Sequence, residues 1–143
     1  MLCISNPALA VQLLKADQTI EISPMILERV IGFSENELIF EVIDHVKDLN
    51  VVYTMSPLET AIRAGKIEVV QHLIEAGADI NYEIKSEDGM HYTAMHVAAE
   101  NTSNDILKYL LEKGGDLEVE DSEGMLPYDR AKAAGLEENV KIL

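Results

Sequence analysis

Cysteine is almost absent from this chain of 143 residues, which has a single one at Cys3. One thiol cannot form an internal disulfide and has no second cysteine to complete a zinc-ligand pair, so the sequence favours a reducing compartment. Long hydrophobic runs are missing too, because no stretch approaches the ~18 apolar residues of a membrane-spanning helix. The short apolar start has no basic residue before it and is soon interrupted by Lys15 and Asp17. We therefore expect no signal peptide and no membrane partner, and we predict a cytoplasmic protein.

Positive charge is also scarce. The chain has 11 Lys and Arg against 26 Asp and Glu, which gives a formal net charge of −15. A surface this negative repels phosphate groups, which argues against nucleic acid as a ligand. It would attract a protein with a basic surface, although acidity could equally serve only to keep the protein in solution. With 48% hydrophobic residues, the chain is long enough for a real core, and we predict a single domain over 1–143.

Signatures of catalysis are missing as well. The sequence has no glycine-rich phosphate loop and no serine or cysteine nucleophile motif. His91 and His96 lie five residues apart, not at the spacing that places two metal ligands on one helical face, and we expect His45 and His72 to be partly exposed. Five carboxylates within 116–123 lie in a predicted loop, where we expect them to be solvated. We predict no catalytic, cofactor-binding or metal-binding residue and no enzyme; the alternative is a hydrolase or metalloenzyme built on His91 and this acidic loop.

Two segments of the chain, 56–81 and 93–118, align without a gap. Gly77 lies 21 residues after Ser56, and Gly114 lies 21 residues after Thr93. The hydroxyl of Ser56 or Thr93 can cap a helix, and glycine is suited to end one. Between these positions, apolar residues recur at helical spacing at Val69, Val70, Leu73 and Ile74, and again at Ile106, Leu107, Leu110 and Leu111. Each segment is thus predicted to form a helix–turn–helix unit followed by a loop.

These segments resemble the ankyrin repeat, whose pattern includes T-P-L-H-x-A-A, V-V-x-L-L and G-A-D-V-N. Here the chain reads S-P-L-E-T-A at 56–61 and G-A-D-I-N at 77–81. The resemblance is strong over 53–131, weaker over 22–52 and absent over 1–21. It implies an all-α fold, a helical solenoid of stacked helix–turn–helix repeats with hairpin-like loops, and a binding module. It also implies that His96, in the histidine position of the motif, is structural and connects neighbouring loops by hydrogen bonds.

The resemblance divides the chain into consecutive units. We predict an N-terminal capping helix within 1–21, a degenerate repeat at 22–52, repeats at 53–85 and 86–120, and a C-terminal capping repeat at 121–143. In the N-terminal cap, Leu9, Val11, Leu13 and Leu14 are available to cover the end of the array. In the last unit, Asn139 replaces an apolar residue of the second helix.

One loop is longer than the family pattern. Thr93 lies 37 residues after Ser56, against a repeat period of about 33. The extra residues fall in 82–92, where ankyrin-like proteins project a hairpin finger, and this loop is rich in side chains able to anchor a partner. Tolerated loop drift, with apolar residues folding back onto the array, is the alternative. With the adjacent concave face and the equivalent fingers, the predicted partner-binding residues are Tyr53, Met55, Arg63, Tyr82, Glu83, Lys85, Met90, His91, Tyr92, Glu100, Asn101, Glu120, Glu123 and Met125.

The sequence therefore predicts a protein–protein interaction module that binds a partner, with a basic surface, through its loop fingers and concave face. A narrower hypothesis is a small acidic inhibitor, such as an immunity protein that neutralises a toxin or effector. The alternative from another class is an acidic mimic of nucleic acid that blocks a DNA- or RNA-binding protein. We predict a monomer, or weak self-association through the apolar C-terminal end, and no cofactor.

Overall fold

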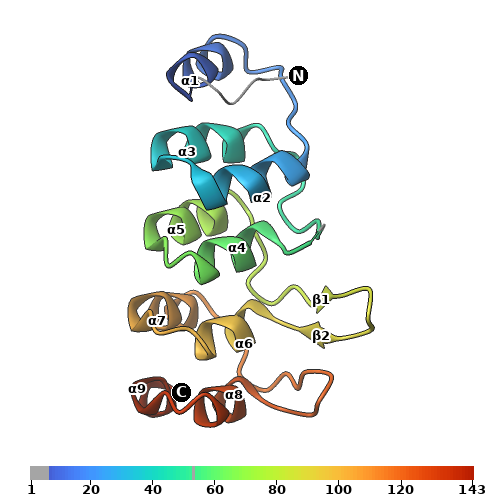
Figure 1. Cartoon of the computed structure of the whole chain (residues 1–143), viewed down its shortest axis with the longest axis vertical. Helices are drawn as coiled ribbons and strands as arrows, with labels where there is room; N and C mark the ends of the chain where they lie inside the picture. The colour runs from blue at the N-terminus through green and yellow to red at the C-terminus, as the bar shows by residue number, and fades with distance from the viewer. Residues whose placement is uncertain (1–6, 53) are drawn as a thin grey trace.

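The computed structural model of the chain describes residues 7–52 and 54–143. Its helices form pairs that follow one another down the long axis of the molecule (Figure 1). The fold is an all-α helical solenoid, as predicted, with one short two-stranded hairpin at its side. None of the described helices combines the length and the apolar character needed to cross a bilayer. The elements in chain order are α1 (Pro7–Ala16), α2 (Pro24–Phe33), α3 (Asn36–Asp44), α4 (Pro57–Arg63), α5 (Ile67–Glu75), β1 (Ile84–Lys85), β2 (His91–Tyr92), α6 (Ala94–Ala99), α7 (Asn104–Glu112), α8 (Pro127–Ala133) and α9 (Glu137–Ile142).

The ends of the helices follow from local sequence. Oγ of Ser56 accepts a hydrogen bond at 3.1 Å from the backbone N–H three residues later, so Ser56 caps α4 as predicted. At Thr93 the cap takes a different form, because the Thr93 N–H donates to Nδ1 of His96 at 3.2 Å. Gly77 and Gly114 follow α5 and α7 with φ angles of +108° and +90°. Glycine reaches this left-handed region without the steric cost of a Cβ, which is why the second helices end there.

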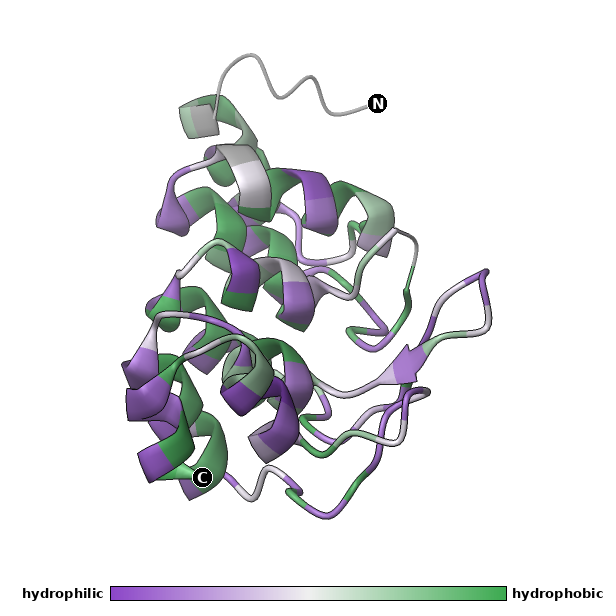
Figure 2. Cartoon of the chain, turned by 60° about the horizontal axis from the view of Figure 1, so that its bottom comes forward, coloured by the Kyte–Doolittle hydropathy of each residue, from purple (hydrophilic) through white to green (hydrophobic). Residues whose placement is uncertain are grey.

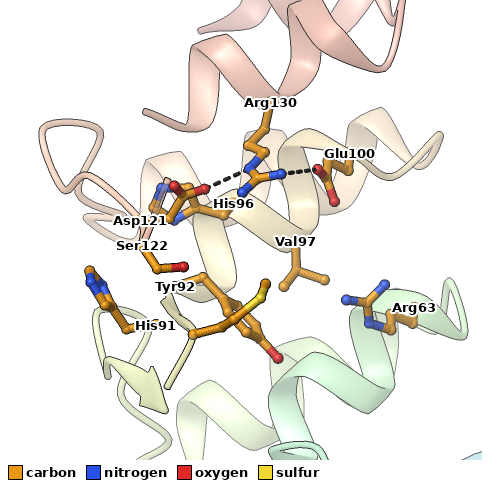
Figure 3. Close-up of a pocket in the computed structure, with 10 residues that line it drawn as sticks. Arg63, His91, Tyr92, His96, Val97, Glu100, Asp121, Ser122 and Arg130 are labelled. Carbon is orange, nitrogen blue, oxygen red and sulfur yellow. Dashed lines mark hydrogen bonds and ion pairs between the residues drawn. The ribbon is translucent and has the colours of Figure 1, made fainter. Parts of the chain in front are cut away.

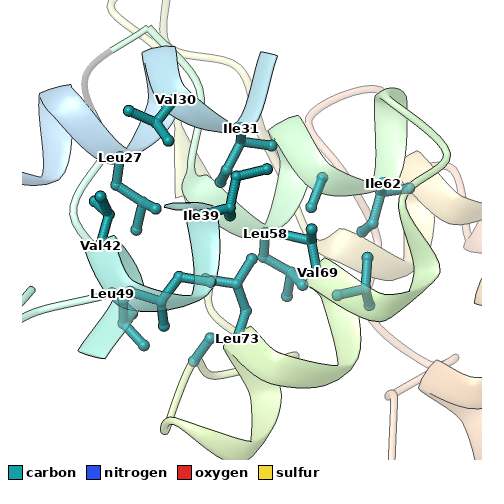
Figure 4. Close-up of a cluster of buried hydrophobic side chains, with 14 of the residues drawn as sticks. Leu27, Val30, Ile31, Ile39, Val42, Leu49, Leu58, Ile62, Val69 and Leu73 are labelled. Atoms are coloured by element: carbon teal, nitrogen blue, oxygen red, sulfur yellow. The ribbon is translucent and has the colours of Figure 1, made fainter. Parts of the chain in front are cut away.

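The helix pairs stack in two rows. The first helices α2, α4, α6 and α8 contact one another in order, and the second helices α3, α5, α7 and α9 do the same. Ala61, Ala98 and Ala99 are fully buried, and their small side chains allow neighbouring helices to approach closely. A continuous hydrophobic core runs through the stack, and Figure 4 shows part of it around α2 to α5. Burying one of its Leu or Ile side chains contributes roughly 1.5–3 kcal/mol, so this core stabilises the solenoid.

Helix α1 packs against α3 and covers the N-terminal end of the stack. Val11 and Leu14 are buried, as predicted, but Leu9 and Leu13 are 51% and 48% exposed. The expectation that all four cover the array is therefore wrong for Leu9 and Leu13. The buried residues at positions 10, 11 and 14 have the spacing of a single helical face, and that face is the one turned toward the array.

The two histidines expected at the surface differ from each other. His72 is partly exposed, as predicted; its ring stacks on Phe40 with centroids 4.6 Å apart, and its Nε2 lies 3.0 Å from Oδ1 of Asp44. His45 is only 6% exposed, so the expectation of a surface position is wrong for it. Its Nδ1 lies 2.7 Å from a carbonyl oxygen one turn back in α3. The preceding segment packs close to it, because the Ile22 N–H donates to the His45 carbonyl at 2.9 Å.

Polar side chains connect each repeat to the one before it. Nζ of Lys66 donates to the Ser34 carbonyl at 2.9 Å, and Nδ2 of Asn101 donates to the Ile62 carbonyl at 3.0 Å. Nδ2 of Asn139 donates to the Asn101 carbonyl at 2.7 Å and to a second carbonyl at the end of α6 at 2.8 Å. Asn139 is fully buried. These two hydrogen bonds pair both N–H donors of the amide at a position where the sequence pattern expects an apolar residue, whereas its Oδ1 is buried without a hydrogen-bond partner among the described residues.

Two loops project from the side of the stack, and we refer to 82–92 as the first finger and to 116–125 as the second finger. In the first finger, Ile84 pairs with Tyr92 and Lys85 pairs with His91 in an antiparallel hairpin. Gly89, with φ of +80°, lies in its turn. Figure 2 shows the hairpin extending away from the helices with hydrophilic residues at its tip. The longer loop predicted from the repeat spacing is therefore an ordered hairpin.

Candidate functional site

A hollow of about 190 Å³ lies between the two fingers and the first helices α4, α6 and α8 (Figure 3). The fingers and the helices contribute to it together, so its walls come from three successive repeats. It combines apolar side chains with charged ones and is open to solvent. The residues that line it are Arg63, Met90, His91, Tyr92, His96, Val97, Glu100, Asp121, Ser122 and Arg130.

One wall of the hollow is built on a buried carboxylate. Glu59 in α4 has a side chain only 1% exposed, and it accepts hydrogen bonds from Nε of Arg63 at 2.9 Å and from the Tyr92 hydroxyl at 3.1 Å. Glu59 occupies the position that His96 has in the next repeat. Burial raises the pKa of the Tyr92 hydroxyl above its usual range, and the negative charge of Glu59 raises it further. Tyr92 is therefore a neutral donor that connects the first finger to α4.

The opposite wall is built on an ion pair between the second finger and α8. Nε of Arg130 donates to Oδ2 of Asp121 at 2.6 Å, and the Asp121 side chain is 1% exposed. Arg130 also contacts a carboxylate oxygen of Glu123 at 2.7 Å and one of Glu100 at 3.7 Å. Burial alone would raise the pKa of Asp121, but the hydrogen bonds from Arg130 and from the backbone N–H groups of Met125 and Glu123 lower it below its usual range. Asp121 therefore holds the second finger in place as a carboxylate.

Two histidines contribute to the hollow in different ways. Because Nδ1 of His96 accepts the Thr93 N–H, its Nε2 carries the proton and donates to the Met125 carbonyl at 3.0 Å. This connection between neighbouring loops is the structural role that the resemblance implied for His96. His91 lies at the finger side of the hollow, with Nδ1 3.3 Å from a carboxylate oxygen of Glu83. Its backbone carbonyl accepts the Ser122 N–H at 3.0 Å, so the two fingers are hydrogen-bonded to each other.

The hollow brings together five of the predicted partner-binding residues. Arg63, Met90, His91, Tyr92 and Glu100 all line it, although they are far apart in the sequence. They come from the end of α4, from the second half of the first finger and from the residue that follows α6. The fingers and the first helices thus share one surface, and a binding role for that surface remains a prediction.

The other predicted residues do not line the hollow. Tyr82 is exposed at the base of the first finger, beside a shallow depression that Asn50 also lines. Glu83 and Lys85 form an ion pair at 3.4 Å. The Asn101 side chain makes hydrogen bonds within the array. Of the remainder, Met55 and Met125 are partly buried, Glu120 and Glu123 are exposed, and Tyr53 lies outside the described residues.

Five residues of the hollow were not predicted to bind a partner: His96, Val97, Asp121, Ser122 and Arg130. Asp121 was expected to be solvated with the other carboxylates of its loop, and its burial against Arg130 shows that this expectation is wrong for it. Arg130 lies 33 residues after Val97, in the same position of the repeat. An arginine at the repeat position where the preceding repeat has a valine was a signal in the sequence that a carboxylate lies close to Arg130.

Stacked helix pairs with fingers on one side define a repeat scaffold that presents a surface to a partner. The chain belongs to the ankyrin-repeat family: the family model described as "Ankyrin repeats (3 copies)" matches residues 1–121. The match includes 1–21, so the expectation that the resemblance is absent there is wrong. Ankyrin repeats are generally protein-interaction modules, and proteins built from them typically have no enzymatic activity.

The chain is also similar to individual ankyrin-repeat proteins over part of its length. It is 38% identical over 76 residues to Alpha-latroinsectotoxin-Lt1a of Latrodectus tredecimguttatus, covering 52% of this chain and 5% of the toxin. It is 32% identical over 75 residues to Protein phosphatase 1 regulatory subunit 27 of Homo sapiens, covering 52% and 46%. It is 28% identical over 94 residues to Ankyrin repeat and SOCS box protein 5 of Homo sapiens, covering 65% and 27%. The chain thus spans less than half the length of each of these relatives.

Proposed function

We propose that this protein is an interaction module that binds a partner protein through its two fingers and the hollow between them. The observation that carries the proposal is the hollow itself, in which residues of three repeats meet beside an exposed Met90. Apolar and aromatic side chains surrounded by charged groups are typical of the centre of a protein interface.

The partner that suits this surface is basic. The protein has a net charge of −15, and the fingers carry exposed carboxylates at Glu87, Asp88, Asp116, Glu118 and Glu120. Negative charge on the projecting loops would steer a basic partner toward the hollow and raise the association rate. The association rate should therefore fall steeply as salt is added; a rate insensitive to salt would argue against a basic partner.

A narrower role, as an inhibitor or immunity protein that acts by covering a basic surface of its target in the cytoplasm, is compatible with this mode of binding. It is supported by the net negative charge and by the single cysteine. A mimic of nucleic acid is less well supported, because Asp121 and Glu123 of the second finger already form ion pairs with Arg130.

Self-association through the C-terminal end is also less well supported. Ile142 and Leu143 pack against the core, which leaves less apolar surface for a second copy at this end.

The test is partner capture with matched variants. The tagged protein is used to capture partners from native lysate, captured proteins are identified by mass spectrometry, and the dissociation constant is measured for each. We expect Tyr82→Ala combined with Met90→Ala to weaken binding, because both side chains are exposed on the finger. Lys108→Ala combined with Glu112→Ala, at exposed positions of α7 on the opposite row, is the control. Equal binding by both double variants would place the interface elsewhere.

A further inference from the structure

We infer that the hollow between the fingers takes up one lysine or arginine side chain of the partner, which pairs with Glu100. This inference rests on the proposed function and specifies what the site recognises. Two of the three arginines of the chain line the hollow, which at first suggests an anionic ligand. Each of them, however, is already hydrogen-bonded to a carboxylate that is 1% exposed: Arg63 to Glu59 and Arg130 to Asp121.

The charges that remain after this pairing are negative. Glu100 is 41% exposed, and its contact with Arg130 is long, at 3.7 Å. Glu123 also contacts Arg130, whose positive charge is already matched by Asp121. The two arginines are therefore surrounded by four carboxylates, an excess of two. An arriving carboxylate would meet this excess and would have to compete with Glu59 for Arg63, whereas an arriving cation finds Glu100 without a close partner.

The shape of the hollow suits a long side chain with a charged end. Figure 3 shows the Tyr92 ring pointing toward the side of the hollow where Arg63 lies, with Glu100 and Arg130 on the opposite side. Tyr92, Val97 and Met90 provide apolar surface for the methylene groups of lysine or arginine, and the Tyr92 ring can accept a cation on its face. At about 190 Å³, the space is comparable to the roughly 150 Å³ cavity that is known to take up benzene. It therefore holds one side chain.

The first experiment uses a minimal probe. N-acetyl-arginine amide is titrated into the isotope-labelled protein, with N-acetyl-citrulline amide, which has the same shape without the charge, and N-acetyl-glutamate amide as comparisons. We expect saturable shifts of the backbone amides of Tyr92, Val97 and Glu100 with the arginine probe alone, and a dissociation constant in the millimolar range. Stronger shifts with the glutamate probe, or none with any probe, would overturn the inference.

Two matched variants then test whether the carboxylate that pairs with the arginine probe is Glu100. Glu100→Gln should weaken arginine binding about three- to fivefold, because it keeps the shape of the side chain and removes its charge. Glu112→Gln, an exposed position of α7, should leave binding unchanged, and thermal melting shows whether each variant is folded.

The capture assay separates this inference from the proposed function. If Glu100→Gln binds the captured partner with unchanged affinity while the Tyr82 and Met90 double variant does not, the interface is right and the cation pocket is wrong. If neither variant affects the partner, the interface itself is wrong.

Discussion

The hydrogen bond between Tyr92 and Glu59 should be a measurable part of the stability of this protein. In Tyr92→Phe the ring and its packing remain, but the buried Glu59 carboxylate loses the hydroxyl donor at 3.1 Å and retains the Arg63 donor at 2.9 Å. Hydrogen bonds to charged groups are worth about 1.5–3 kcal/mol. We expect a loss of about 2 kcal/mol in the free energy of unfolding, which for a chain of this length corresponds to a fall in Tm of roughly 6–8 °C.

The assay is urea unfolding followed by circular dichroism. Tyr128→Phe is the matched control: Tyr128 is 42% exposed, so the loss of its hydroxyl should change the free energy of unfolding by less than about 0.5 kcal/mol. Glu59→Gln completes a double-mutant cycle, because the charge-assisted bond becomes a neutral one and the effect of Tyr92→Phe should shrink by about 1 kcal/mol. Equal stabilities for Tyr92→Phe and the wild type, or a coupling energy near zero, would refute the proposed connection between the first finger and α4.

Three further outcomes follow from the same contacts. The pKa of Asp121 is lowered, so the stability that Asp121 contributes is fully present above the unfolded pKa of about 3.9 and is lost as the pH falls through the folded pKa. In Asp121→Asn the free energy of unfolding should therefore fall less steeply as the pH is lowered, and an unchanged slope would contradict this. The pKa of Tyr92 is raised, so the stability that Tyr92 contributes is present below the unfolded pKa of about 10 and is lost as the pH rises through the folded pKa. Ultraviolet titration should show one tyrosine that ionises at higher pH than the others, and this late titration step should be absent in Tyr92→Phe. Asn139→Ala leaves two carbonyls without a donor, at roughly 1–3 kcal/mol each, so the amides of α9 should exchange faster with solvent, whereas in the control Lys141→Ala they should not.

Features that depend on neighbouring residues in the chain could be predicted from the sequence. The cap at Ser56 and the helix ends at Gly77 and Gly114 are local, because each depends on a backbone conformation within one turn. The longer first finger was visible as an increase in repeat spacing, which is a property of the sequence pattern alone.

Features that depend on tertiary partners could not be predicted in the same way. The burial of His45 was not visible in its sequence neighbours. The burial of Asp121 depends on its pairing with Arg130, and the sequence hints at this pairing only through the repeat position of Arg130. The charge balance of the hollow requires knowing that Arg130 reaches Asp121 and that Arg63 reaches Glu59. Residue types in the hollow were therefore partly foreseen, but their pairing was not.

The hydrogen bonds that hold the second finger have a consequence for the thermodynamics of recognition. The Ser122 N–H is held by the His91 carbonyl, and His96 holds the Met125 carbonyl, so the second finger is fixed both to the first finger and to α6. A ligand that docks between the two fingers therefore meets a second finger that is already fixed in position. The protein loses little conformational entropy when the ligand binds. Loosening either hydrogen bond should therefore make binding entropically less favourable while the contacts with the ligand stay the same.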